Sequence, residues 1–269
     1  MSSFATAAGK KGTLLFDPLD VTGAWKWPDA AAHVLIRMRD VCLSGVRLLS
    51  DRQPDRVLVD DHTSGFPAIW LHEDKPKTAW IIVNIAGSDW CRMCYQFGHE
   101  LGHVLSNSWD PKARPQTPCQ WIEEALVEAF SIRGLGLLAT SWEQEPPFSG
   151  NENFAKSIRE YRQALVDRYM NLATEQRAGP DLAPWFATHR EHVEAQGGLA
   201  GDGTAAVPVF LTVLETNNDC VESLGALNRW PQRTGLPIEE YFSRWEASCA
   251  EINASPQLPN WLRTSLLGN

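Results

Sequence analysis

The sequence lacks any long uninterrupted hydrophobic run. No apolar stretch reaches the roughly 18–20 residues that a membrane-spanning helix needs, which argues against an ordinary helical membrane protein. Residues 1–16, MSSFATAAGKKGTLLF, lack the charged start and continuous apolar core of a secretory signal peptide. We therefore expect a cytoplasmic protein whose residues 1–12 form a flexible N-terminal tail.

Runs of lysine and arginine are also absent. The chain has 24 basic and 33 acidic residues, which gives a formal net charge of −9. Nucleic acids and anionic membranes are usually bound through basic patches, so this composition argues against both as partners. The oligomeric state cannot be deduced from these features.

Cysteines are few and scattered. The six are Cys42, Cys91, Cys94, Cys119, Cys220 and Cys249. In a chain of this size without an export signal, they are expected to be reduced thiols. The spacing of Cys91 and Cys94 also occurs in redox and zinc sites, but no second cysteine pair accompanies it. Because both lie in a predicted helix, we interpret them as core residues.

The composition is that of a globular protein, with 43% hydrophobic and 21% charged residues. Twelve tryptophans are expected mostly in the core. Runs rich in Val, Ile and Trp predict strands over 56–60, 68–72 and 78–85. Apolar residues at helical spacing predict helices over 28–50, 89–106, 120–138, 151–176, 181–196, 205–228 and 237–253, with a short helical end segment. Ser88 is the expected N-cap of the second helix.

The order of these elements is helix, sheet, two helices and a helical remainder, which predicts an α+β fold. The stretch 146–150 contains two prolines and a glycine and is expected to be a boundary. It divides an N-terminal α/β lobe over 13–145 from a mostly helical C-terminal lobe over 146–269.

The segment that carries chemistry is Gly98-His99-Glu100-Leu101-Gly102-His103. On a helix, residues four apart lie above one another with their Cβ atoms about 5–6 Å apart. Two imidazoles placed in this way can bind one metal ion from one face. Glu100 can then take a proton from a bound water, which is the mechanism of the H-E-x-x-H motif.

A second helix offers further carboxylates in Trp121-Ile122-Glu123-Glu124-Ala125-Leu126-Val127-Glu128. Catalytic zinc typically has three protein ligands and one open position, and Glu124 could be the third ligand. Glu128 lies four residues later on the same face. It could accept the outer N–H of a ligating histidine and fix the tautomer of the ring.

His99-Glu100-x-x-His103, followed 21 residues later by Glu124-x-x-x-Glu128, resembles the gluzincin metallopeptidases, the thermolysin-like clan. The resemblance implies a zincin-like fold, in which a small sheet precedes the motif helix and a helical lobe follows it. It also implies a zinc metallopeptidase with a peptide or protein substrate, and we expect an endopeptidase rather than an exopeptidase. Where Glu128 stands the family has an aspartate. The resemblance covers roughly residues 78–131.

In the expected mechanism, zinc lowers the pKa of bound water from ~15.7 to about 7, and Glu100 transfers its proton to the leaving amine. The resemblance also implies a tyrosine or histidine from the C-terminal lobe that stabilises the oxyanion. The candidates are Tyr161, Tyr169, His189 and His192, of which we retain Tyr169 and His189.

The strand predicted over 78–85 has two interpretations. It could be a sheet edge on which an extended peptide substrate pairs, as the resemblance implies. Its apolar run from Trp80 to Val83 is nearly as typical of a buried central strand.

Three other functions fit parts of the pattern. A di-iron carboxylate protein would use Glu100-x-x-His103, but it requires a second E-x-x-H pair and four bundled helices. A zinc-binding regulatory protein would keep the site without the activity. A hydrolase of non-peptide amide or isopeptide bonds would use the same chemistry as a peptidase.

Overall fold

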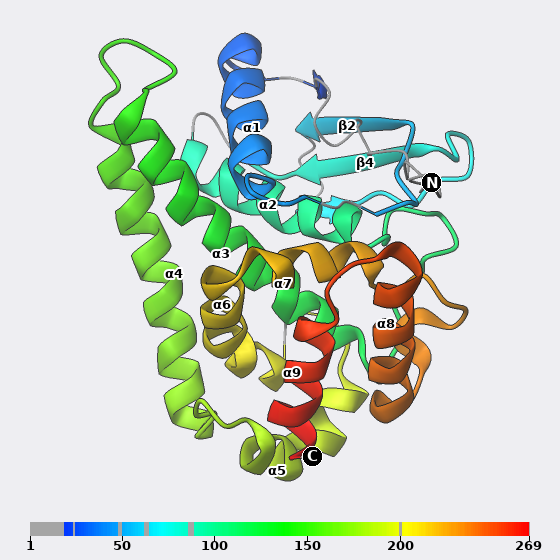
Figure 1. The fold of residues 1–269 in the computed structure, drawn as a ribbon. Helices are drawn as coiled ribbons and strands as arrows, with labels where there is room; N and C mark the ends of the chain where they lie inside the picture. Colours follow the sequence, from blue (N-terminus) through cyan, green and yellow to red (C-terminus); the bar gives the residue numbers. More distant parts are fainter. Residues whose placement is uncertain are drawn as a thin grey trace, which may run out of the picture.

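The structure is a computed structural model that describes residues 19–23, 25–47, 50–61, 65–85, 89–198 and 201–268. It is a mixed α/β structure that is mostly helical and contains one small sheet in the described residues (Figure 1). The tail expected over 1–12 and the N-cap expected at Ser88 lie outside the described residues.

The sheet has four strands in the order β1-β2-β4-β3. These are β1 (Asp20–Gly23), β2 (Arg56–Asp61), β3 (Ala68–Ile69) and β4 (Thr78–Val83). β1, β2 and β4 are parallel, and β3 pairs antiparallel with β4 through Ala68 opposite Ile82 and Ile69 opposite Ile81. β4 is therefore a central strand, and β3 is the edge strand. Of the two interpretations of 78–85, the central strand is confirmed and the sheet edge is wrong.

Helix α1 (Pro28–Cys42) connects β1 to β2 and begins with Pro28 in its first turn, where proline is tolerated. It is shorter than predicted, because the chain turns after Cys42 and Gly45 adopts a positive φ of 77°. β1 was not predicted. Its sequence, Asp-Val-Thr-Gly, has no apolar alternation, and it gains its hydrogen bonds from β2.

Two helices form the centre of the molecule. α2 (Trp90–Leu105) follows the sheet, and its N-cap is Asp89, whose side chain accepts a hydrogen bond from the backbone N–H of Arg92 at 3.1 Å. α3 (Gln120–Gln144) is longer than predicted, because neither glycine nor proline follows Leu138 before Pro146. α3 is buried along most of its length and packs against α1, α2, α4 and α6.

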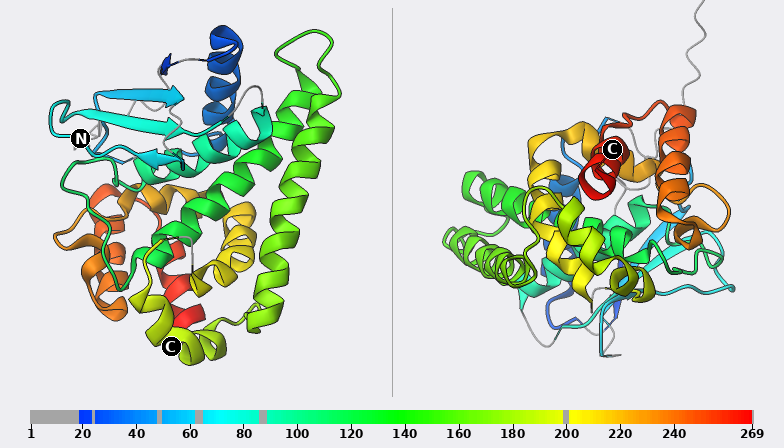
Figure 2. Two further views of the ribbon diagram at one scale, coloured as in Figure 1. Left: turned by 180° about the vertical axis from the view of Figure 1, so that it is seen from behind. Right: turned by 90° about the horizontal axis from the view of Figure 1, so that it is seen from below.

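The remaining chain is helical. α4 (Phe154–Gln176) runs beside α3 along one side of the molecule, as both views in Figure 2 show. It is followed by α5 (Ala183–Ala195), η2 (Asp202–Ala206), α6 (Val207–Thr216), α7 (Asn218–Glu222), η3 (Ser223–Ala226), η4 (Arg233–Gly235), α8 (Ile238–Ile252) and α9 (Gln257–Leu267). The helix predicted over 205–228 is thus broken, because Asn217 is extended and its side chain caps α7.

One cluster of buried hydrophobic residues runs through the described chain, from Leu19 to Leu266. All six cysteines are free and buried, which confirms their interpretation as core residues. Burial also raises the pKa of the Cys91 thiol to about 11. Among the described residues, no helix is both long and apolar enough to cross a bilayer. The expected division into two lobes near residue 146 stays a prediction.

The close contact of α2 with α3 depends on a glycine. A Cβ atom at Gly102 would lie 2.8 Å from Cβ of Val127. We expect Gly102→Ala to lower the free energy of unfolding by about 1–3 kcal/mol, because the two helix backbones must separate. Urea unfolding measures this change. Gly179→Ala is the control, since its Cβ would meet no heavy atom within 4 Å. Equal stability of both variants would contradict the prediction.

Candidate metal centre

The functional side chains lie where α2 crosses α3. His99, Glu100 and His103 come from the last two turns of α2, and Glu124 comes from the beginning of α3. Gly98 and Gly102 allow this approach, since a Cβ at either position would meet α3 atoms within 3 Å, at Ser131 and Val127 respectively. Packing therefore places the two histidines directly opposite the glutamate.

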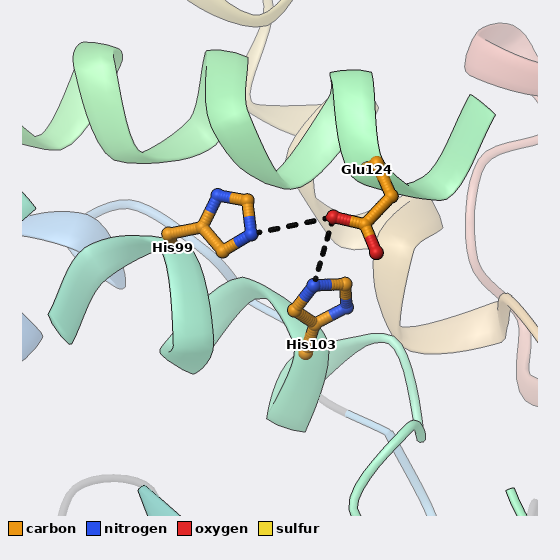
Figure 3. A group of neighbouring side chains, drawn as sticks. All are labelled: His99, His103 and Glu124. Atoms are coloured by element: carbon orange, nitrogen blue, oxygen red, sulfur yellow. Dashed lines mark ion pairs between the residues drawn. The ribbon is translucent and has the colours of Figure 1, made fainter. Parts of the chain in front are cut away.

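The three predicted ligands point toward one another (Figure 3). Nε2 of His99 lies 3.5 Å from Oε2 of Glu124, and Nε2 of His103 lies 3.6 Å from the same oxygen. The ligand atoms of the three residues all lie within 4.8 Å of one another. The side chain of Glu124 is only 14% exposed. Spacing along the sequence predicted that these residues meet, and the structure brings them together.

These residues fit a divalent metal ion. Ligands at about 2.0–2.1 Å from a tetrahedral ion are about 3.3 Å from one another, close to the two distances between histidine and glutamate. The outer nitrogen, Nδ1, of each ring is bonded to another carboxylate. Nδ1 therefore donates to the carboxylate, and each Nε2 faces the centre of the group, where a neutral ring could bind a metal ion.

A carboxylate and two tyrosines stand behind His99. Oε2 of Glu128 lies 3.0 Å from Nδ1 of His99, in the position expected from the sequence. The hydroxyls of Tyr95 and Tyr169 both donate to Oε1 of Glu128, at 2.6 and 2.8 Å. The side chain of Glu128 is fully buried. These bonds hold the ring of His99 in one orientation.

A second carboxylate stands behind His103. Oε1 of Glu123 lies 2.8 Å from Nδ1 of His103, and Nδ2 of Asn228 donates to Oε2 of Glu123 at 2.6 Å. The hydroxyl of Ser108 also donates to Glu123, and Arg233 donates to that hydroxyl at 2.6 Å. Each imidazole is therefore bonded to a different buried acid: His99 to Glu128, after Glu124 in the chain, and His103 to Glu123, before it.

The carboxylates control the charge of the imidazoles. Burial lowers the pKa of His99, but Glu124 and Glu128 outweigh it and raise the pKa to about 9. In the same way, Glu124 and Glu123 raise the pKa of His103 well above its usual value despite burial. Burial raises the pKa of Glu124, yet the two imidazoles hold it below the usual range. Without a metal ion, the site therefore stores positive charge on its rings.

Glu100 lies beside the three ligands and is buried, with 4% of its surface exposed. The backbone N–H of Ile69 in β3 lies near its carboxylate and acts to lower its pKa. Burial raises its pKa, and the negative charge of Glu124 adds to this effect against the two imidazoles. Glu100 has no part in holding either histidine, so its carboxylate is available for a proton.

The group forms the floor of a cleft of about 610 Å³. The cleft is bordered by β3 and the two residues before it, by Leu71, by one face of α2, by the first turn of α3, and by Ser108, Pro115 and Gly198. Glu100, His99, His103 and Glu124 all line it. A molecule of peptide size can therefore reach the three ligands and Glu100.

The expected oxyanion donors do not line this cleft. The hydroxyl of Tyr169 is buried and bonded to Glu128, on the far side of His99. Nδ1 of His189 lies 2.9 Å from the backbone carbonyl of Trp185, and the ring of His189 stacks on the indole ring of Trp185. Tyr161 contacts the ring of Tyr95, and His192 lies 3.3 Å from Asp202. None of these four side chains is among the described residues that line the cleft.

Three supporting residues were missed in the sequence. Tyr95 precedes His99 by four residues, so helical spacing alone could have placed it on the same face. Glu123 lies on a different side of its helix from Glu128, so the spacing of the acids does not indicate that it reaches His103. Asn228 carried no signal, because it approaches from a loop 105 residues beyond Glu123.

Glu123 provides the first test of the site. We expect Glu123→Gln to weaken divalent metal binding by about 10–100-fold, because the ring of His103 loses the charged acceptor that orients it. Competition with a chromophoric chelator measures the affinity. Glu143→Gln is the matched control, since Glu143 is an exposed residue paired with Arg159 on the surface. Unchanged affinity in Glu123→Gln would show that the acid does not support the metal.

Comparisons with models of known protein families, with curated proteins and with solved structures found no match. The function of the chain must therefore be argued from the geometry and chemistry of this site alone.

Proposed function

We propose that the protein is a zinc-dependent peptidase in which His99, His103 and Glu124 hold the metal and Glu100 is the general base. One observation carries the proposal: two imidazole nitrogens and a carboxylate oxygen converge within 4.8 Å on the floor of a cleft that Glu100 also lines. This arrangement leaves the open side of the metal position toward the cleft.

The donor set favours zinc. Two neutral imidazole nitrogens and one carboxylate are a standard ligand set of catalytic zinc, whereas magnesium and calcium prefer oxygen donors. The charge balance points the same way. Glu100, Glu123 and Glu128 are buried, the side chain of Glu124 is only 14% exposed, and Arg233 is a permanent cation that reaches Glu123 through Ser108. A divalent cation offsets much of the remaining negative charge.

A zinc ion at this position would polarise a carbonyl group and lower the pKa of a water molecule to about 7. The Glu100 carboxylate accepts the proton of the attacking water and then donates it to the nitrogen of the leaving amine. The nearby N–H of Ile69 favours the ionised form of the carboxylate, which is the form that accepts the proton. Glu128 and Glu123 keep the two imidazoles in fixed tautomers, so neither ring exchanges a proton with the substrate.

The substrate is proposed to lie along β3. The N–H of Trp70 bonds to the carbonyl of Trp80 at 2.8 Å, so the polar groups of the preceding residue, Ile69, face away from β4. An extended peptide could donate to the outward-facing carbonyl of Ile69 on this short edge, where it would pass over Glu100. The order of sheet, motif helix and glutamate helix supports a zincin-like fold and the resemblance to gluzincins.

The supporting bonds also favour one metal ion over two. Glu123 and Glu128 are each bonded to a histidine, which leaves Glu124 as the one carboxylate of α3 that faces the ligand nitrogens. A di-iron site would require further free carboxylates. Hydrolysis of a non-peptide amide and a regulatory zinc site remain the alternatives, because both would use the same three ligands.

Glu100→Gln tests the proposal. The variant should keep about one zinc ion per chain but lose turnover by at least roughly a hundredfold, because glutamine cannot accept the proton. Metal content is measured by elemental analysis, and turnover by mass spectrometry of a peptide library. Chelation of the metal should stop cleavage by the wild-type protein, and added zinc should restore it.

Glu73→Gln is the control, because Glu73 is an exposed acid outside the cleft. Wild-type turnover by Glu100→Gln would contradict the role of Glu100. A zinc-loaded wild-type protein that cuts no peptide would favour a regulatory role or a non-peptide substrate, and two irons per chain would favour the di-iron protein.

A further inference from the structure

Gln96 is a polar residue of the cleft that takes no part in holding the metal position. It lies on α2, three residues before His99 and four before Glu100, on the face that lines the cleft. Residues four apart on a helix have Cβ atoms about 5–6 Å apart. The side chain of Gln96 is therefore one helical turn away from Glu100, beside the reacting atoms.

The orientation of the Gln96 amide is fixed by a hydrogen bond from the backbone N–H of Asn84. The backbone N–H of Asn84, which follows β4, donates to Oε1 of Gln96 at 2.8 Å. This position requires an acceptor, so the amide cannot be turned to place Nε2 there. Oε1 is thus used by the protein itself, and the two N–H groups of Nε2 must point elsewhere.

Nε2 of Gln96 has no hydrogen-bond partner among the residues that the structure describes, although Gln96 is only 4% exposed. Nε2 is not among the fully buried side-chain atoms of the described residues that lack a partner, so it reaches the solvent in the cleft. A donor pair held in place and left unpaired on the wall of a cleft is typical of a group that meets its partner on the substrate.

The charges in the cleft select among acceptors. The described residues that line the cleft include the acids Glu100, Glu123 and Glu124 but no lysine or arginine. A substrate carboxylate next to Gln96 would lie near Glu100, one helical turn away, and no lysine or arginine among the described lining residues would offset its charge. A neutral acceptor, such as the carbonyl oxygen of a side-chain amide or a hydroxyl oxygen, meets no such repulsion.

We propose that Gln96 is a specificity-determining residue, and that its Nε2 donates hydrogen bonds to a neutral acceptor on a substrate side chain within one or two residues of the cleaved bond. This inference rests on the proposed peptidase function. It assigns the substrate class as peptides with asparagine, glutamine, serine or threonine at that position. The main-chain pairing along β3 and the proton transfers of Glu100 do not involve Gln96.

The test compares two variants with the wild-type protein on one peptide library. Gln96→Glu has nearly the same shape and keeps the acceptor for Asn84, but it replaces the donor with an acceptor. We expect a change of preference from amide and hydroxyl side chains to lysine and arginine. Gln96→Met removes both polar atoms, and it should shift the preference to apolar side chains. For the best wild-type peptide, kcat/KM should fall about tenfold in each variant.

A peptide with alanine at the selected position separates recognition from general damage. Its kcat/KM should change less than twofold in either variant, and the zinc content should stay at the wild-type value. Gln257→Glu is the matched control, because Gln257 lies on α9 and its Oε1 accepts from Asn217 at 2.6 Å. That variant should keep the wild-type profile. Thermal unfolding identifies any variant that fails to fold.

The outcomes separate the two proposals. If the wild-type protein cuts peptides and both variants keep its profile, the role of Gln96 is wrong while the peptidase function stands. An equal loss of kcat/KM for the alanine peptide would also overturn the inference, since it would show a structural role. If the wild-type protein cuts no peptide in the library, both proposals fail together.

Discussion

The close approach of α2 and α3 depends on the need to partner the carboxylates buried between them. Glu100, Glu123, Glu124 and Glu128 are all largely removed from water at the crossing of α2 and α3. Burying an ion costs several kcal/mol unless partners compensate for it. His99 and His103 supply those partners for three of the acids, and a backbone N–H supplies one for Glu100. The glycines of α2 are a consequence, because the helices must approach closely for these bonds to form.

The two histidines are supported differently. His99 depends on Glu128 and on two tyrosine hydroxyls from α2 and α4, which are long helices packed in the centre of the molecule. His103 depends on Glu123, which is held by a serine and an asparagine from loops. The contacts of His99 lie between long helices that are packed in the centre. The contacts of Glu123 join loops that are distant in the chain, so the position of His103 depends on how the C-terminal helices pack.

Much of the site could be predicted from the sequence, because its main contacts follow from helical spacing. His99 and His103 had to share a face, and so did Glu124 and Glu128. Contacts that depend on how separate elements pack could not be derived in this way. The support of His103 by Asn228 is one example, and the edge position of β3 is another. The apolar run of β4 was compatible with two places in a sheet, and only the pairing with β2 and β3 decided between them.

The bonds from Asn228 and Arg233 also have a consequence for biosynthesis. A chain emerging from the ribosome exposes His99, His103 and Glu124 well before Asn228 and Arg233 have been made, since these residues lie 105 and 125 positions after their partners Glu123 and Ser108. Until then, Glu123 lacks the contacts that hold it against His103. The contacts that hold Glu123 against His103 are therefore complete only once Arg233 has been synthesised.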